Sequence, residues 1–249
     1  MQTYGLIGLT LGHSFSKGFF TNKFKDEQIT AQYKNFELPT IEDFTKLIEN
    51  YPSIAGLNVT IPYKEQIIPY LDDCSAEAKA IGAINVIQFK TTPNGNVKLI
   101  GHNSDVYGFT ESIRPLLKPV HTKALILGTG GASKAVLAGL NSLHIETLFV
   151  SRTKSKQAIS YEEVTKELIE EYKVIINTTP LGMHPNENSL PAIPYTLLTK
   201  EHLLYDLVYN PETTAFMKAG LQQGATVKNG LEMLHLQAIK AWEIWNESP

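Results

Sequence analysis

Residues 123–143 read KALILGTGGASKAVLAGLNSL, and this stretch decides the fold of the second half of the chain. An apolar run, Ala124 to Leu127, leads without a polar break into Gly128, and apolar residues recur at helical spacing from Ala132. The pattern predicts a strand, a glycine turn and a helix. The turn is a variant of the dinucleotide-binding fingerprint, whose glycines let the backbone approach a pyrophosphate at a helix N-terminus. Taken alone, it also fits a helix start that merely needs glycine.

The next predicted strand, Thr147 to Val150, carries a second cofactor signal at its end. It runs into Ser151-Arg152-Thr153, and Lys156 follows. An acidic residue usually stands here when the cofactor is NAD, whereas a basic residue suits the 2′-phosphate of NADP. Because a guanidinium pairs well with phosphate, Arg152 favours NADP(H), although a solvated basic turn is the alternative for this segment alone.

Composition is that of a soluble globular protein with one large or two ordinary domains. The chain has 249 residues, 43% hydrophobic and 19% charged, with a formal net charge of -3. This charge gives no reason to expect nucleic acid or an anionic membrane as a partner. There is no apolar run of membrane-span length and no targeting segment, and the one cysteine, Cys74, fits a reducing compartment, so we expect a cytoplasmic protein. The seven histidines form no metal-ligand pattern, so we expect no metal.

Strand and helix signals alternate along the whole chain, which indicates an α/β fold. In the first part we expect strands over 4–9, 32–38 and 55–60, helices over 17–26 and 41–49, and a hairpin of 83–90 with 98–101. A helix over 105–117, ended by Pro119, then opens a doubly wound unit with strands near 124–127, 147–150, 174–177, 203–207 and 225–227. The last helix, 231–245, should place Leu231, Leu234, Ala238 and Trp242 along one apolar stripe.

Polar residues gather in two stretches of the first part. Alternation puts Asn58 and Thr60 on one side of a strand end, and Lys64 follows one short turn later. The second stretch, 101–105, reads GHNSD and lies beside Asn85 on the adjoining hairpin. Such a set can hold a polyhydroxylated molecule.

Motifs along almost the whole chain resemble those of the shikimate dehydrogenase family, NADP-dependent enzymes of aromatic amino acid biosynthesis. The matching motifs, in the family's order, are Ser14-Phe-Ser16, Asn58-Val-Thr60-Ile-Pro62-Tyr-Lys64, Gly82-Ala-Ile-Asn85, Asn103-Ser-Asp105-Val-Tyr-Gly108, Gly128-Thr-Gly130-Gly131-Ala132, Ser151-Arg152-Thr153, Asn177-Thr-Thr-Pro180-Leu-Gly182-Met183, Asp206-Leu-Val-Tyr209-Asn-Pro211 and Asn229-Gly230-Leu-Glu-Met-Leu234 with Gln237. Any one of them can arise by chance, but the ordered set is specific.

The resemblance implies a fold and a reaction. It implies a substrate-binding domain over 1–105, a Rossmann-type NADP-binding domain over 106–230, and a final helix, 231–249, that returns to complete the first domain. The implied reaction is the reversible, NADPH-dependent reduction of 3-dehydroshikimate to shikimate on the chorismate pathway.

The same resemblance assigns the catalytic pair. Lys64 is the expected acid/base, because the carbonyl oxygen must gain a proton as hydride arrives at its carbon. Asp105 resembles the family's partner to this lysine, where positioning is its main contribution. The alternative for Asp105 is an N-cap of the helix that follows.

Substrate-binding residues are implied in the same way. Ser14 and Ser16 would donate to the substrate carboxylate from one side of an extended loop, with Tyr209 on the carboxylate side. The ring hydroxyls would be shared among Asn58, Thr60, Asn85, Gln237 and Asp105.

Cofactor contacts complete the expected site. The pyrophosphate is assigned to Gly128, Thr129, Gly130, Gly131, Ala132 and Ser133, the 2′-phosphate side to Ser151, Arg152, Thr153 and Lys156, and the nicotinamide side to Thr178, Met183, Leu207 and Gly230. Met183 can instead have a purely structural role, since methionine often fills gaps in a protein core. Gly230 can instead be a glycine that serves only the start of a helix.

Three departures from the family pattern stand out. Lys17, Phe20 and Thr21 occupy positions where Pro and then His-Asn are usual, Ser151 replaces the common Asn, and 155–173 is short and rich in charge. These departures touch the first helix and the adenine pocket, and they leave Lys64 and Asp105 in place.

Several alternatives remain open from the sequence. A quinate/shikimate dehydrogenase using NAD shares most motifs, a methylenetetrahydrofolate dehydrogenase shares only the Rossmann half, and a non-catalytic NADP-binding regulatory paralogue would not need Lys64 and Asp105. A structural or interaction protein has no use for the polar clusters. The sequence does not decide between a monomer and a homodimer.

Overall fold

The computed structural model describes residues 1–12 and 14–247 of the chain. They form two compact units: residues 1–104 together with the segment that begins at His235 make the first unit, and residues 105–234 make the second. The chain therefore leaves the first unit once, after Ser104, and returns to it within its last helix.

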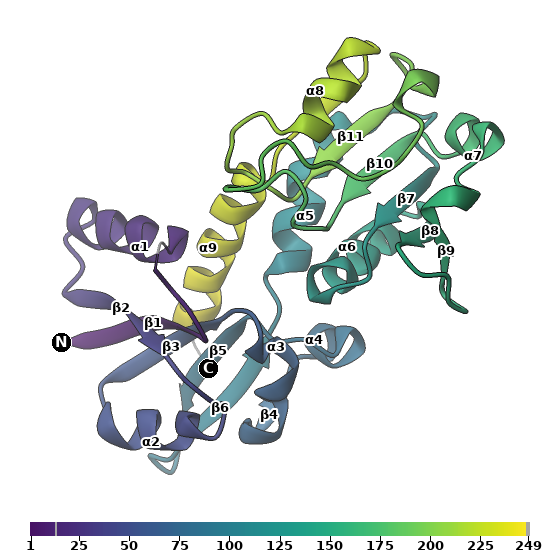
Figure 1. Cartoon of the computed structure of the whole chain (residues 1–249). Coiled ribbons are helices and arrows are strands. Elements are labelled where there is room, and N and C mark those ends of the chain that lie inside the picture. The colour runs from purple at the N-terminus through teal and green to yellow at the C-terminus, as the bar shows by residue number, and fades with distance from the viewer. Residues whose placement is uncertain (13, 248–249) are drawn as a thin grey trace. The chain divides into compact units, whose positions relative to one another are not determined.

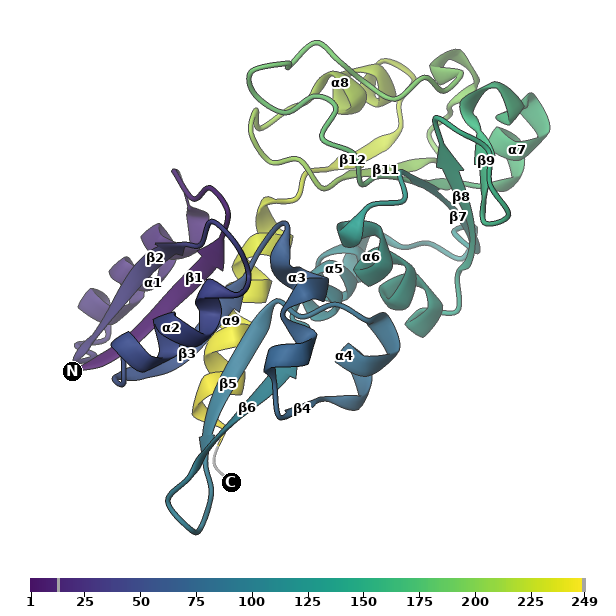
Figure 2. The same cartoon turned by 60° about the horizontal axis from the view of Figure 1, so that its bottom comes forward.

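The first unit is built on a six-stranded mixed sheet. Its strands are β1 (Gln2–Gly8), β2 (Ala31–Glu37), β3 (Ile54–Val59), β4 (Asp73–Cys74), β5 (Val86–Thr91) and β6 (Val97–His102), in the spatial order β2-β1-β3-β5-β6-β4. Its helices are α1 (Phe15–Asp26), α2 (Asp43–Asn50), α3 (Tyr63–Gln66), α4 (Ala76–Ile81) and most of α9 (Leu231–Asn246). The β5–β6 pair is the expected hairpin (Figure 2), and Gly95 in its loop has a φ of 81°.

Helices cover both faces of this sheet. Figures 1 and 2 show α1 and α9 on one face and α2 on the other. Phe44 and Leu47 of α2 pack into one core, while Phe20 of α1 and Ala241 of α9 pack into the other. Each strand of the central part is therefore buried on both sides, as parallel strands require.

Helix α9 is fitted to the first sheet by Trp245. Its indole N–H donates to the Ile87 carbonyl at 3.1 Å, and a Cβ at Gly56 would lie 2.4 Å from the indole ring. The predicted stripe on this helix is wrong in part. Leu231 is exposed, and the most buried side chains are Met233, Ala238, Ala241, Ile244 and Trp245. The helix begins in the second unit and ends in the first, so no single apolar stripe is buried along its whole length.

The second unit holds a six-stranded parallel sheet, which agrees with the predicted doubly wound unit. Its strands are β7 (Lys123–Leu127), β8 (Glu146–Ser151), β9 (Ala158–Ser160), β10 (Val174–Asn177), β11 (Leu203–Asp206) and β12 (Thr226–Lys228), in the order β12-β11-β10-β7-β8-β9. Helices α5 (Asp105–Ile113) and α6 (Gly131–Ser142) pack on one face, and α7 (Lys166–Glu171) and α8 (Ala215–Gln222) on the other. The sequence signals had not indicated β9, α7 or α8.

Helix α5 ends earlier than predicted. It stops at Ile113 and continues as a 3₁₀ turn, Arg114–Leu116, so Pro115 and not Pro119 ends it. Proline has no N–H to donate and its ring clashes with the carbonyl four residues back, which explains the early end.

In the described part of the chain, none of the helices combines the length and the apolar character that a bilayer crossing needs. Across residues 1–12 and 14–247, no group of three His, Cys, Asp or Glu side chains is arranged as a metal site.

Candidate active site

Main-chain hydrogen bonds join the three segments of the first unit that carry the predicted catalytic lysine and its polar neighbours. The Val59 N–H donates to the Asn85 carbonyl at 2.9 Å, and the Ile84 N–H donates to the Lys64 carbonyl at 2.7 Å. Asn58, Lys64 and Asn85 therefore lie on directly connected backbone, although they are up to 27 residues apart in the chain.

Lys64 lies on the short helix α3, which two buried side chains fix to the core. Tyr63 donates its hydroxyl to the Leu38 carbonyl at 2.5 Å, and Ile67, one turn later, is fully buried. Because the residues on either side of it are anchored, the stem of Lys64 has a fixed origin. The side chain is half-buried.

Asn85 holds the segment that leads to Asp105. Its Oδ1 accepts from the Ser104 N–H at 2.7 Å, and its Nδ2 donates to the Ser104 hydroxyl at 3.0 Å. Asp105 is the next residue, the first of α5, and it is only 5% exposed. The side chain of Asn85 thus acts on the main chain immediately before the predicted catalytic carboxylate.

The two serines do not lie in an extended loop, so that part of the prediction is wrong. Ser14 is the N-cap of α1, and its hydroxyl accepts from the Lys17 N–H at 3.2 Å. Ser16 is the second residue of the helix, which begins two residues before the predicted start at Lys17. Capping fills one of the unpaired amide positions at the helix start, and this explains the earlier beginning.

The remaining predicted substrate residues divide between the units. Thr60 follows the end of β3, and Gln237 lies on α9 within the first unit; both are half-buried. His235 packs its ring on Phe15 with centroids 4.8 Å apart, so this part of α9 lies against the start of α1. Tyr209 belongs to the second unit, where it is 38% exposed after β11.

The glycine turn sits at the topological switch point of the second sheet. Strand β7 lies between β8 and β10, and the chain reverses its winding direction there. Gly128 has a φ of 103°, and a Cβ on it would lie 2.9 Å from the Thr178 hydroxyl. A Cβ on Gly130 or Gly131 would meet nothing within 4 Å. The turn therefore leaves open space at the N-terminus of α6, where a pyrophosphate is best bound.

Other residues of the turn support its shape. Ser133 is buried and donates its hydroxyl to the Gly130 carbonyl at 2.7 Å, while Thr129 and Ala132 are exposed and half-buried respectively. Thr178 donates its hydroxyl to the Leu127 carbonyl at 2.8 Å and ties the end of β10 to the end of β7. The hydroxyl groups of Ser133 and Thr178 are thus hydrogen-bonded to the protein's own main chain.

Cations follow the end of β8, and they differ in what they contact. Lys154 is paired with Glu163, and the hydroxyl of Ser151 donates to the Thr153 carbonyl. Arg152 and Lys156 are exposed, and neither forms an ion pair with a carboxylate in residues 1–12 and 14–247. Their positive charge is available to an anionic ligand.

The residues predicted for the nicotinamide side lie after the next strands of the same sheet. Met183 is 48% exposed, which rules out a core-filling role for it. Leu207 directly follows β11, and Gly230 precedes α9; a Cβ on Gly230 would lie only 2.2 Å from the Leu207 carbonyl oxygen. Glycine is thus needed at 230 because the two backbones touch there.

A buried carboxylate at this edge of the second sheet was not predicted from the sequence. The buried carboxylate of Asp206 accepts from Thr214 Oγ1 at 2.6 Å, Asn177 Nδ2 at 2.9 Å and the Val208 N–H at 3.0 Å. Burial raises the pKa of Asp206 to about 6, and these hydrogen bonds oppose the shift. A polar residue that ends a buried apolar strand, as Asn177 and Asp206 do, was the signal available in the sequence.

A parallel sheet with an open glycine turn at its switch point and free cations after the next strand defines a nicotinamide-nucleotide-dependent oxidoreductase. Residues 6–87 match the family described as shikimate dehydrogenase substrate binding domain. The protein named shikimate dehydrogenase (NADP(+)) of Clostridium beijerinckii is 42% identical over 99% of this chain and 93% of its own length. The chain belongs to the shikimate dehydrogenase family.

Solved structures agree with this assignment. Shikimate dehydrogenase from Aquifex aeolicus has 35% identity and a TM-score of 0.86, covering 100% of this chain and 94% of that one. The Thermus thermophilus shikimate 5-dehydrogenase in complex with NADP(H) and shikimate has 28% identity and a TM-score of 0.85, covering 99% of this chain and 94% of that one. The predicted fold is thereby confirmed.

Proposed function

We propose that this chain catalyses the reversible, NADPH-dependent reduction of 3-dehydroshikimate to shikimate, a step of chorismate and aromatic amino acid biosynthesis. The observation that carries the proposal is the placement of Lys64 on backbone bonded directly to the segment of Asn85, next to Asn58 and Thr60. One potential proton donor among amide and hydroxyl groups suits a polyhydroxylated carbonyl compound.

The residues of the second unit fit NADP(H). The open positions at Gly130 and Gly131 leave room for a pyrophosphate, and Arg152 and Lys156 offer charge for a 2′-phosphate. We assign Ser151 and Thr153 to the edge of the same phosphate region, and Thr178, Met183, Leu207 and Gly230 to the nicotinamide side. When bound, NADPH supplies the hydride.

Lys64 supplies the proton. As negative charge develops on the substrate carbonyl oxygen, its ammonium group donates a proton to that oxygen, and in the oxidising direction the neutral amine takes the proton back. Half-burial of the side chain strengthens this interaction, because the charge on the oxygen is less screened than in water.

Asp105 positions the reacting groups. Its backbone follows Ser104, which two hydrogen bonds to Asn85 hold in place. A carboxylate there can accept a hydrogen bond from a substrate hydroxyl. Its contribution is orientation, while the proton transfer belongs to Lys64.

Substrate recognition is assigned to hydroxyl and amide groups. Ser14, Ser16 and Tyr209 serve the carboxylate, and Asn58, Thr60, Asn85 and Gln237 serve the ring hydroxyls. Thr60 and Gln237 have no side-chain hydrogen bond to any other described residue, so their polar atoms are available to a ligand.

We infer a cytoplasmic enzyme, since NADPH and the reducing conditions suited to the free Cys74 are found there. It acts as a monomer or homodimer on a small-molecule substrate.

The test follows reduced nicotinamide by absorbance when the purified chain meets shikimate. NADP and NAD are supplied separately, and quinate is run in parallel. Turnover of shikimate with a strong preference for NADP is the expected result. Turnover of quinate with NAD would instead identify a quinate/shikimate enzyme. Binding of NADP by folded protein without turnover of either substrate would identify a non-catalytic regulatory paralogue.

A further inference from the structure

We propose that Tyr33 of β2 is a positioning residue that orients the amide of Asn58 for the substrate through its hydroxyl group. The inference rests on the proposed function and adds a residue that no sequence motif indicated. It concerns substrate affinity, and it assigns Tyr33 no part in proton or hydride transfer.

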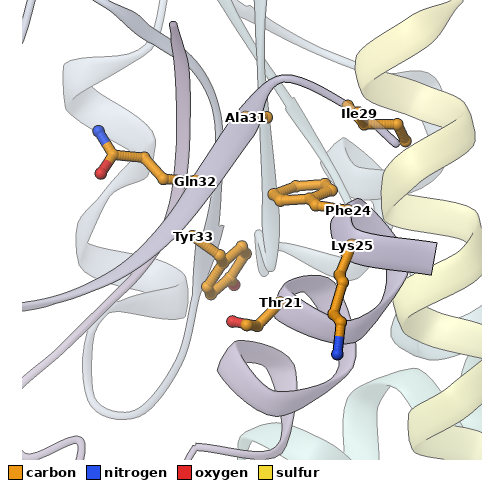
Figure 3. A pocket seen from close by; sticks show the side chains of 7 residues that line it. All are labelled: Thr21, Phe24, Lys25, Ile29, Ala31, Gln32 and Tyr33. Atoms are coloured by element: carbon orange, nitrogen blue, oxygen red, sulfur yellow. The ribbon is translucent and has the colours of Figure 1, made fainter. Parts of the chain in front are cut away.

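The ring of Tyr33 is held firmly. It is 5% exposed and stacks on Phe20 of α1 with centroids 4.8 Å apart and planes inclined by only 10°. On its outer side the ring forms part of an open groove of about 410 Å³, next to Thr21 and Lys25 of α1 (Figure 3). Since packing fixes the ring, the position of the hydroxyl group is fixed as well.

The hydroxyl group contacts a predicted substrate residue. It donates to Asn58 Oδ1 at 2.8 Å. A residue of β2 thereby fixes a polar side chain near the end of β3.

The bond from Tyr33 determines which way the Asn58 amide faces. With Oδ1 accepting from Tyr33, Nδ2 is directed to the Asn85 carbonyl at 3.3 Å. The second hydrogen on Nδ2 has no acceptor in residues 1–12 and 14–247. Asn58 is therefore presented as a donor to a substrate hydroxyl. Burial raises the pKa of Tyr33, so the phenol stays protonated and the orientation persists at neutral and alkaline pH.

Two further residues on the same face of β2 hold the chain before α1. Asn35 Nδ2 donates to the Leu11 carbonyl at 2.8 Å, and Glu37 Oε1 accepts from the Leu11 N–H at 2.7 Å. Residues 33, 35 and 37 share one face because side chains alternate along a strand. This face of β2 thus also holds the chain at Leu11, before α1 begins.

Tyr33→Phe tests the proposal, because it removes the hydroxyl and keeps the stacked ring. We expect the KM for shikimate to rise about tenfold, with a smaller change in kcat and an unchanged KM for NADP, as loss of one buried hydrogen bond predicts. Calorimetry with shikimate and cofactor-free protein should show the same loss of affinity. Tyr4→Phe is the matched control: Tyr4 lies in the same aromatic cluster, and among the described residues its hydroxyl donates only to Gln2, at 3.4 Å.

A double-mutant cycle with Asn58→Ala tests the route through Asn58. If Tyr33 acts by orienting that amide, Asn58→Ala costs clearly less in the Tyr33→Phe background than in the wild type. Full additivity, an unchanged KM for shikimate, or equal losses for shikimate and NADP would overturn the proposal. Wild-type protein that fails to turn over shikimate would overturn the proposed function itself, and this inference with it.

Discussion

At the scale of single residues, Lys64 is the side chain on which the proposed chemistry depends most. Lys64→Ala removes the proton donor and leaves α3 anchored through Tyr63 and Ile67. We expect kcat to fall about 10²- to 10⁴-fold, the usual contribution of a general acid/base. The KM for NADP should hardly change, because the cofactor residues belong to the second unit. Steady-state kinetics measure both quantities, and near-normal turnover would refute the acid/base assignment.

Arg152 is the residue proposed to select NADP over NAD. Its guanidinium is exposed and forms no ion pair with the carboxylates of the described chain, so it can bind a 2′-phosphate. Arg152→Ala should weaken NADP binding about 10- to 100-fold and leave NAD binding unchanged, because only NADP carries the phosphate. Lys154→Ala is the control, since Lys154 is already paired with Glu163. Equal losses for NADP and NAD in a titration would contradict the contact.

Asp206 predicts a pH dependence of stability. Burial raises its pKa to about 6 in the folded protein, above the unfolded value of about 3.9. The folded state therefore binds more protons between these values, and this group makes the free energy of unfolding decrease as pH rises from about 4 through about 6. Asp206→Asn keeps the shape of the side chain and removes the titration. Its thermal midpoint should lose that part of the pH dependence; parallel curves for variant and wild type would count against the shift.

At the scale of elements, the second sheet builds its binding edge from the ends of its strands. Gly128, Arg152, Thr178 and Leu207 follow β7, β8, β10 and β11 at the carboxyl edge of one parallel sheet. Hydrogen bonds from Thr178 to Leu127 and from Asn177 to Asp206 hold neighbouring ends together. A displacement of one strand end is therefore expected to displace the end of the neighbouring strand.

Gly230 tests this coupling. A Cβ there would lie 2.2 Å from the Leu207 carbonyl oxygen and 2.8 Å from its carbon, so the backbone after β11 must move. We expect Gly230→Ala to lower kcat/KM for NADP about a hundredfold, the order that a displacement near 1 Å costs. Gly18→Ala on α1 serves as control, since its new methyl group meets nothing within 4 Å. Wild-type kinetics in Gly230→Ala would show that the close approach has no functional consequence.

At the scale of the whole molecule, the first unit is completed by the far end of the chain. Ala241, Ile244 and Trp245 of α9 share a core with Tyr4 and Phe20. Gln88 also donates its side-chain amide to the Ile244 carbonyl at 2.6 Å. The first unit consequently cannot finish its core until the last helix has formed.

Trp245→Ala should destabilise the first unit selectively. Loss of a buried tryptophan costs about 3–5 kcal/mol, and the Ile87 carbonyl loses its donor. We expect thermal unfolding to separate into two steps, with shikimate binding lost in the first and NADP binding, by the second unit, retained until the second. Leu221→Ala, at an exposed position on α8, is the control. A single transition with unchanged shikimate affinity would refute the dependence.

Local patterns in the sequence determined a large part of this protein. The glycine turn, the basic end of β8, the hairpin loop and the alternation of strands and helices are short-range features, because each depends on backbone geometry within a few residues. They predicted the α/β fold, the switch-point turn and the NADP preference. The ordered motifs added the family and the roles that stay predictions for Lys64, Asp105 and the substrate residues.

Only the tertiary structure decided how distant side chains meet. It moved the buried face of α9 toward Trp245, and it joined Tyr33 to Asn58 and Asp206 to Asn177. The last two contacts join residues 25 and 29 positions apart, and they depend on strand order and register. A sequence pattern that extends over a few residues carries no record of which strand will lie beside which, so packing and hydrogen-bond satisfaction decide it.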